Sequence, residues 1–284
     1  MAVRRPDFAG SWYPDTERAC QAMFVEFEDQ CVERKGSQPL WGGIVPHAGW
    51  FFSGRIAYNV LQELSRNVGQ GVETVVLFGG HLRPSSPITV MARGEVWTPF
   101  GNIGTDEELA AAICADNDVK QETPERHTPD NTIELQLPMI RHLLPRASLL
   151  IIGAPPRDEM LELAAAVVQQ ARQLGRRLLV LGSTDLTHYG PNYGWAPKGS
   201  GQEALRWVKE ENDPRWIERA CALDTTGMIE EALESSNACC PGAAAAAARC
   251  ARELGSSQAE LLAYSTSADI RPDASFVGYA GILL

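Results

Sequence analysis

The chain alternates short apolar runs with longer segments in which apolar residues recur at helical spacing. The apolar runs span residues 43–45, 74–78, 88–91, 148–152, 177–181, 261–264 and 276–282. The segments with helical periodicity span residues 16–33, 54–66, 106–114, 133–144, 157–174, 201–209, 214–221, 225–234 and 243–254. Fully apolar strands that alternate with helices are typical of a sheet covered on both faces. The pattern therefore predicts an α/β fold.

The domain organisation follows from the length and from the lack of a linker in the sequence. A chain of 284 residues corresponds to one large or two small domains at roughly 100–200 residues each. The turn-rich stretch 191–200 is short enough to be a loop, and the sequence contains no internal repeat. We therefore expect residues 1–284 to form a single domain.

Three of the five histidines closely follow apolar runs. His47 lies in IVPHAG, His81 ends VVLFGGH, and His188 ends LLVLGSTDLTH. In open α/β sheets, sites form outside the carboxyl ends of the strands, so these imidazoles converge if their strands are parallel neighbours. Asp185 precedes His188 by three residues and could fix its tautomer or raise its basicity.

The alternative is that these histidines are structural. A single histidine after a strand is more often a hydrogen-bonded structural residue than a ligand, so it is the three together, with glycine neighbours, that favour a site. The other two histidines lack this pattern. His142 belongs to the predicted helix 133–144, where packing or surface exposure is expected. His127 lies in a polar loop, and its role stays open.

Composition narrows the class of partner. Lys and Arg total 25 and Asp and Glu total 36, which gives a net charge of −11. A chain this acidic is a poor candidate for binding nucleic acid or an anionic membrane. No window approaches the roughly 18 apolar residues that span a bilayer, and the basic N-terminus lacks the apolar stretch of a secretory signal. The seven cysteines form no CxxC framework, which predicts reduced thiols and a cytoplasmic protein.

Two adjacent cysteines precede the predicted helix 243–254. Asn237 is the candidate N-cap, and Pro241 suits a first helical turn. The positive end of a helix favours a thiolate, so Cys239 and Cys240 are candidates for chemistry. The alternative is that they are small core residues, which we favour for Cys240. Packing is the expected role of Cys20, Cys31, Cys114 and Cys250.

Six segments carry a resemblance to a known family. They span residues 5–14 (RPDFAGSWYP), 45–54 (VPHAGWFFSG), 78–81 (FGGH), 183–190 (STDLTHYG), 264–267 (YSTS) and 277–280 (VGYA). As a set, they are similar to the motifs of the Memo family, which is also called AmmeMemoRadiSam system protein B. The resemblance covers nearly the whole chain.

The resemblance implies both a fold and a metal site. The fold would be a single-domain, three-layer αβα structure with a mixed, largely parallel central sheet, like that of the class III extradiol dioxygenases, which are non-haem iron enzymes. The metal ligands would be His47, His81 and Cys239. Cys239 is preferred to Cys240 because residues 239–242 align with a Cys-Gly-x-Gly sequence of the family.

The resemblance also implies a catalytic set. His188 matches the acid/base histidine of the dioxygenases, and Asp185 would be its neighbour. The family has a Glu-His-Ser-(Ile/Leu)-Glu run, of which this chain keeps Glu134 but carries Asn131 in place of the histidine. An amide does not exchange a proton near neutral pH, so an acid/base or ligand role at position 131 is lost. His127 could take the place of the family histidine only if its loop follows a different path.

The implied site leaves the metal and the substrate open. Two imidazoles and one thiolate leave coordination positions free, as in a catalytic or sensing site. Fe(II) is the first expectation because of the fold relatives, while the thiolate also suits Cu or Zn. Cys240 stands where the family has Gly and could join the site or form an oxidised species with Cys239. We expect a metal-dependent redox enzyme of the dioxygenase type. The candidate pocket aromatics, with core packing as the alternative, are Trp12, Tyr13, Trp50 and Tyr189.

Other functions stay open. Some relatives are described as signalling adaptors that recognise phosphotyrosine peptides, which requires a cation at the pocket rim, and Arg83 is the candidate. The composite family name suggests instead a partner subunit of a radical-SAM enzyme. A hydrolase built on Ser183 or Ser267 would lack the GxSxG elbow. The expected partner is therefore an unknown small molecule, a peptide or a protein.

Overall fold

The computed structural model describes residues 1–68 and 71–284. Within these residues the main sheet has nine strands. They are β2 (Gly42–Val45), β3 (Thr74–Gly79), β4 (Thr89–Met91), β7 (Lys120–Glu122), β8 (Ser148–Gly153), β9 (Leu178–Ser183), β10 (His188–Tyr189), β11 (Glu260–Thr266) and β12 (Phe276–Leu283). Their order is β10-β12-β2-β9-β3-β8-β4-β7, with β11 paired to β12. A small second sheet contains β1 (Val3–Arg4), β5 (Glu95–Val96) and β6 (Ile103–Gly104).

The centre of the main sheet is parallel and its flanks are not. Strands β2, β9, β3 and β8 all run parallel, whereas β12 is antiparallel to β2 and β4 is antiparallel to β8. The residues of β2, β3 and β9 are all buried, which explains why these strands read as unbroken apolar runs in the sequence. The carboxyl ends of β2, β9 and β3 therefore lie together at one edge of the sheet.

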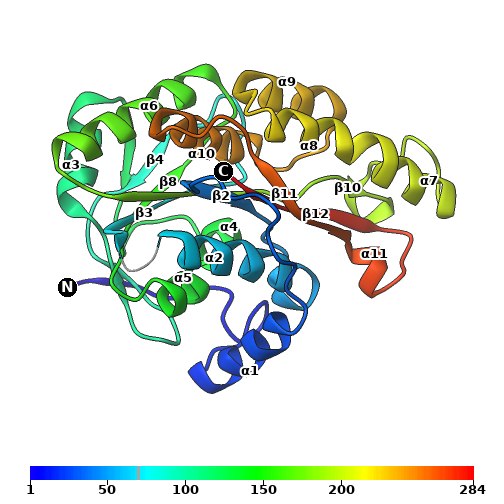
Figure 1. Cartoon of the computed structure of the whole chain (residues 1–284), viewed down its shortest axis with the longest axis horizontal. Helices are drawn as coiled ribbons and strands as arrows, with labels where there is room; N and C mark the ends of the chain where they lie inside the picture. The colour runs from blue at the N-terminus through cyan, green and yellow to red at the C-terminus, as the bar shows by residue number, and fades with distance from the viewer. Residues whose placement is uncertain (69–70) are drawn as a thin grey trace.

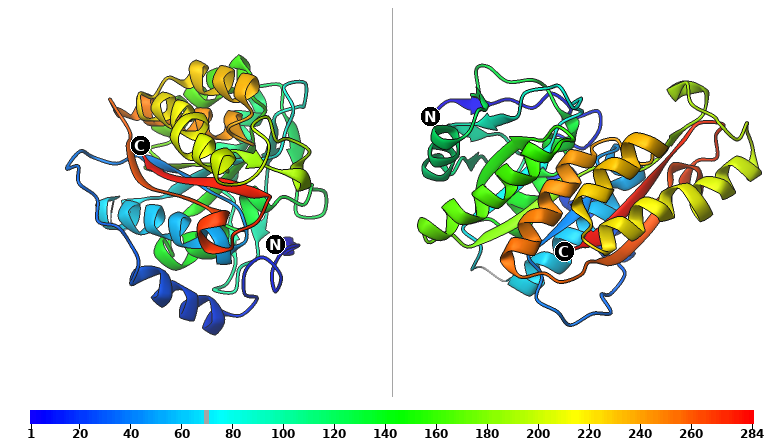
Figure 2. Two further views of the ribbon diagram at one scale, coloured as in Figure 1. Left: turned by 90° about the vertical axis from the view of Figure 1, so that its right-hand side faces the viewer. Right: turned by 90° about the horizontal axis from the view of Figure 1, so that it is seen from above.

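Helices cover both faces of the sheet (Figure 1). One face carries α3 (Glu107–Asp116), α6 (Asp158–Gln173), α8 (Asp213–Cys221), α9 (Thr225–Ser235) and α10 (Pro241–Leu254). The opposite face carries α1 (Glu17–Glu28), α2 (Arg55–Val68), α4 (Asn131–Glu134) and α5 (Leu137–Leu143). Two short helices, α7 (Gln202–Trp207) and α11 (Ser267–Ile270), lie near the end of the sheet that holds β10 and β12 (Figure 2). The predicted three-layer αβα arrangement around a mixed sheet is confirmed.

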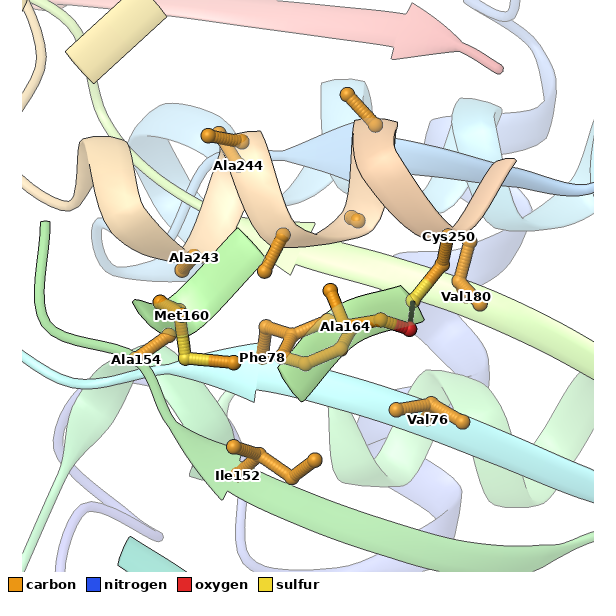
Figure 3. Close-up of a cluster of buried hydrophobic side chains, with 14 of the residues drawn as sticks. Val76, Phe78, Ile152, Ala154, Met160, Ala164, Val180, Ala243, Ala244 and Cys250 are labelled. Atoms are coloured by element: carbon orange, nitrogen blue, oxygen red, sulfur yellow. Dashed lines mark hydrogen bonds between the residues drawn. The ribbon is translucent and has the colours of Figure 1, made fainter. Parts of the chain in front are cut away.

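Helix α10 packs directly on the centre of the sheet (Figure 3). Residues 243–248 are all alanine and all fully buried. Small side chains let the helix backbone approach β9 so closely that a Cβ atom on Gly182 would lie 2.7 Å from the carbonyl oxygen of Ala243. This close contact fixes the start of α10 relative to the carboxyl end of β9.

Several predicted boundaries were wrong, each for a local reason. The segment 133–144 forms two helices, α4 and α5, and Pro138, which has no backbone N–H, lies in the first turn of the second. Helix α1 ends at Glu28, so Cys31 lies outside it. The N-cap of α10 is Cys240 rather than Asn237, whose buried amide donates to the Asn212 carbonyl oxygen.

Short elements escaped the sequence pattern. Strands β1, β5, β6 and β10 have two residues each, too few for a periodicity of two to be recognised. Within residues 1–68 and 71–284, no helix is long and apolar enough to cross a membrane.

Candidate metal centre

Four metal-ligating side chains meet at the carboxyl edge of the sheet. Ligand atoms of His47, His81, Cys239 and Cys240 all lie within 4.8 Å of one another, and we call these residues the His/Cys cluster. His47 and His81 each follow their strand, β2 or β3, by two residues, and both strands pair with β9. The two cysteines directly precede α10. The structure thus brings together the three ligands that the family resemblance implies, and it adds Cys240.

Both ring nitrogens of His47 have defined contacts. Its Nδ1 lies 3.0 Å from Ser183 Oγ, and its Nε2 lies 3.3 Å from Cys239 Sγ. The His47 backbone N–H donates to Asp185 Oδ1 at 2.7 Å, and the side-chain amide of Asn131 donates to the His47 carbonyl oxygen at 3.1 Å. These contacts fix the orientation of a buried ring whose Nε2 faces the cluster, as partners around a metal-bound histidine do.

The Cys239 thiol has the environment of a thiolate. The Asp185 backbone N–H donates to Cys239 Sγ at 3.3 Å. Burial alone would raise the pKa of Cys239, but the hydrogen bond from Cys240 and the nearby His47 imidazole bring that pKa well below its ordinary value. Burial and the adjacent Cys239 raise the pKa of Cys240 well above its ordinary value. Of the two adjacent thiols, Cys239 is therefore the more acidic.

The His47 imidazole lies beside two acidic groups, Asp185 and Cys239. Burial lowers the pKa of this imidazole, but the carboxylate of Asp185 and the thiolate of Cys239 outweigh it and raise the pKa to about 9. Burial raises the pKa of Asp185, and the charge of His47 opposes that rise. A buried cation at this position is thus already stabilised by two anionic groups, which is the electrostatic environment that a metal ion needs.

The cluster borders a cavity of about 580 Å³. His47, His81, Asp185, His188 and Asn131 contribute to its wall. His188, on β10, lies outside the four-residue cluster, and its Nδ1 contacts the Leu186 carbonyl oxygen at 3.1 Å. The candidate acid/base histidine therefore faces the same cavity as the candidate metal ligands.

Glu134 has an anchoring position in the structure. Its carboxylate is buried and accepts hydrogen bonds from the backbone N–H groups of Asp7 and Phe8, both at 2.8 Å, and from the Tyr13 hydroxyl at 3.1 Å. These contacts tie down the N-terminal segment, and Trp12 of that segment lines the cavity. Sequence reasoning placed Glu134 in the catalytic set, whereas its contacts hold the segment that carries a wall residue.

The remaining candidates lie outside the His/Cys cluster. His127 does not fill the position of Asn131, because its ring contacts the Pro124 carbonyl oxygen at 3.0 Å and lies 3.7 Å from Asp7. His142 is exposed and its ring lies 4.9 Å from that of Phe24, so it combines the two expected alternatives, surface exposure and packing. Of the four aromatic candidates, Trp12 lines the cavity, and the core contains Tyr13, Trp50 and Tyr189.

The cation at the cavity rim is Arg271, a residue that sequence reasoning missed. Its guanidinium lies over the rings of Phe51 and Phe52, at 5.6 and 6.0 Å from their centroids. Arg83 follows the ligand His81 in sequence but is not among the residues that line the cavity in the described part of the chain. Arg271 follows the four-residue helix α11, so no periodic pattern marked it.

A buried carboxylate supports the strand that carries His188. Asp213 accepts hydrogen bonds from the backbone N–H of Thr187 at 3.1 Å and from the Tyr264 hydroxyl at 2.7 Å. Burial is the largest influence on this carboxyl, outweighs the hydrogen bonds, and raises the pKa of Asp213 to about 6. The folded protein therefore binds this proton more tightly than the unfolded chain, whose aspartate pKa is about 3.9.

We expect Asp213→Asn to change how stability depends on pH. The proton on Asp213 stabilises the folded wild-type protein at low pH, and this contribution is lost as the pH rises from about 4 to about 6. The free energy of unfolding of the wild type, relative to the variant, should therefore fall by roughly 2–3 kcal/mol over that range and stay constant above it. Urea titrations at pH 4, 5, 6 and 7 measure the free energy of unfolding of both proteins. The same dependence of this free energy on pH in both would refute the prediction.

Together, the fold and the cluster define an α/β protein with a candidate His/Cys metal centre at the carboxyl edge of a mixed sheet. The family model described as Memo-like protein matches residues 4–283. A MEMO1 family protein of Pyrococcus abyssi is 34% identical over 293 residues, which cover 99% of each chain. MEMO1 family proteins of Thermococcus onnurineus and Thermococcus kodakarensis are 32% and 33% identical, again with 99% of each chain covered. The chain belongs to the Memo-like family, as its motifs predicted.

Proposed function

We propose that His47, His81 and Cys239 hold one transition-metal ion and that the chain is a metal-dependent redox protein acting on a small molecule in the adjoining cavity. The observation that carries this proposal is the convergence of three segments, distant in sequence, whose ligand atoms lie within 4.8 Å of one another. His47 and His81 also line the cavity. Two imidazoles and a thiolate are ligands suited to iron, copper and zinc. The donor set therefore fits a transition metal.

The residues around the ligands have distinct parts in this proposal. Iron or copper held by His47, His81 and Cys239 would supply open coordination positions and one-electron redox chemistry. Ser183 orients the His47 ring, and Asp185 fixes the His47 backbone. His188 carries a proton to or from the substrate in the cavity. Fe(II) is the favoured ion because of the resemblance to extradiol dioxygenases. The thiolate ligand also suits Cu and Zn.

The proposal is tested by loading the protein, purified without oxygen, with Fe(II), Cu(I) or Zn(II) in separate samples. We expect one ion per chain, an anomalous-scattering peak among the three ligands, and oxygen consumption by the ferrous form with catechol as the probe substrate. Loss of stoichiometric binding for every ion would overturn the metal centre. Binding without oxygen consumption would overturn the redox activity alone.

His188→Gln separates metal binding from proton transfer. His188 lies outside the cluster, so we expect the variant to bind the metal as tightly as the wild type does. Because positioned acid/base groups contribute typically 10²–10⁴-fold, oxygen consumption with catechol should fall at least about 100-fold. Metal analysis and an oxygen electrode measure the two effects. Unchanged oxygen consumption would exclude the assigned role.

A second candidate function is the binding of an anionic peptide, and the position of Arg271 favours it. This guanidinium lies at the rim of the cavity beside Phe51 and Phe52, so an aromatic group that carries a negative charge finds both partners there. Partnership with a radical-SAM enzyme stays a prediction.

We expect Arg271→Ala to weaken binding of a phosphotyrosine peptide about tenfold, since it removes one charge-assisted contact. Arg83→Ala is the matched control, because it removes an exposed arginine outside the cavity wall and should leave affinity unchanged. Fluorescence anisotropy with a labelled peptide measures both. Equal affinity of the Arg271 variant and the wild type would exclude this function.

A further inference from the structure

One member of the His/Cys cluster has no part in the three-ligand site. The Sγ atom of Cys240 lies 3.7 Å from Cys239 Sγ and within 4.8 Å of ligand atoms on both histidines. Cys240 is buried, with 2% of its surface exposed. Its thiol therefore faces the cluster in the interior rather than solvent.

The backbone holds Cys240 in this position. Its N–H donates to Thr184 Oγ1 at 3.0 Å, and Thr184 directly follows β9. Cys240 is also the N-cap of α10, which is packed against the same strand. Strand β9 and helix α10 thus hold Cys240 rigidly, and ligands of a metal site require such support.

The spacing of the sulfur and nitrogen atoms is that of a tetrahedral site. With Zn–S bonds of about 2.3 Å and Zn–N bonds of about 2.0–2.1 Å, tetrahedral angles place two sulfurs about 3.8 Å apart and a sulfur and a nitrogen about 3.6 Å apart. The two sulfurs lie 3.7 Å apart, and Cys239 Sγ lies 3.3 Å from His47 Nε2. The ring of His81 is exposed at the cavity, so rotation can bring its nitrogen to the fourth position.

We propose that Cys240 is a fourth ligand of this centre, so that a zinc ion bound there has a tetrahedral His₂Cys₂ set. The inference rests on the proposed metal centre and adds to it. Zinc sites with four protein ligands are closed, whereas iron accepts five or six ligands and keeps positions for substrate with all four residues bound. The second thiolate therefore shifts selectivity toward zinc and softer ions. With zinc the four ligands fill the coordination sphere, whereas with iron a position for substrate stays free. Each thiol that binds as thiolate releases its proton.

Cobalt(II) is the probe, because it occupies zinc sites and its spectrum counts thiolates and reports coordination number. We compare the reduced wild-type protein with Cys240→Ala and Cys240→Ser, each loaded with one equivalent of cobalt(II) without oxygen. The wild type should show an intense visible band of tetrahedral cobalt and twice the near-ultraviolet sulfur-to-cobalt absorbance of either variant. In the variants the visible band should weaken several-fold.

Cys114→Ala is the matched control, since Cys114 lies on α3 and is not part of the cluster. Its cobalt spectrum should match that of the wild type. Equal charge-transfer absorbance in the wild type and both Cys240 variants would overturn the fourth ligand while leaving the three-ligand centre standing. Failure of the wild type to bind cobalt or zinc would overturn the fourth ligand. The three-ligand centre would fall with it only if Fe(II) and Cu(I) also failed to bind.

Discussion

Replacing His47 by alanine is expected to lower the affinity of the protein for Fe(II) and Zn(II) by at least about 100-fold. Changes in the groups that merely orient a metal ligand typically cost 10–100-fold, so the loss of a ligand costs more. His47 is also the cluster residue whose ring is fixed on both sides, by Ser183 at Nδ1 and by Cys239 at Nε2. Its removal leaves the Cys239 thiolate without its neighbouring imidazole.

The measurement is a competition titration against a chromophoric chelator, with the thermal midpoint of unfolding as a second readout. A bound ion stabilises the folded state by mass action, so the metal-induced rise in midpoint should disappear in the variant. His127→Ala is the control, because this histidine contacts Pro124 and Asp7 away from the cluster. If the His47 variant keeps the wild-type metal content and midpoint shift, His47 is not a ligand.

The histidine half of the site could be predicted from the sequence because its signals are local. Each of His47 and His81 closely follows an unbroken apolar run, and such runs are buried parallel strands. A glycine lies nearby in both cases, Gly49 after His47 and Gly80 before His81. Their convergence required in addition that β2 and β3 both neighbour β9, a pairing that no local pattern specifies. The family resemblance supplied that information.

The rest of the site depends on contacts between distant segments. Nothing in the spacing of the chain brings Cys239 to His47. Its place before a predicted helix marked this thiol as reactive, and only the resemblance implied that it is a metal ligand. The partners of Glu134 are backbone N–H groups of Asp7 and Phe8, which carry no side-chain signal at all. Arg271 reaches the cavity from an irregular segment after α11. Long-range hydrogen bonds and irregular loops are the features that periodicity does not encode.

The packing of α10 on β9 links the core to the candidate metal centre. The glycine at position 182 precedes Ser183, which orients His47, and the alanine run follows the two cysteines. The helix and the strand therefore set the distance between the histidine and cysteine parts of the cluster. A residue that binds no metal can thus control affinity through this contact.

Gly182→Ala is accordingly expected to damage both stability and metal binding. The added Cβ would lie 2.7 Å from the Ala243 carbonyl oxygen and 2.8 Å from Ala244 Cα, and backbone atoms cannot rotate away as a side chain would. Overpacking of this kind costs about 3 kcal/mol, and here α10 must move away from the sheet. The displacement carries Cys239 away from His47, so metal affinity should fall at least about tenfold.

Gly104→Ala is the matched control for this change. Gly104 is also a strand glycine, and among the described residues other than its two chain neighbours, none has an atom within 4 Å of the position its Cβ would take. Urea unfolding of the metal-free proteins isolates the packing effect, and chelator competition then measures the effect on affinity. Equal stability of the two variants would show that close contact between α10 and β9 does not govern the core. Lower stability with wild-type affinity would show that the cluster holds its geometry independently of this contact.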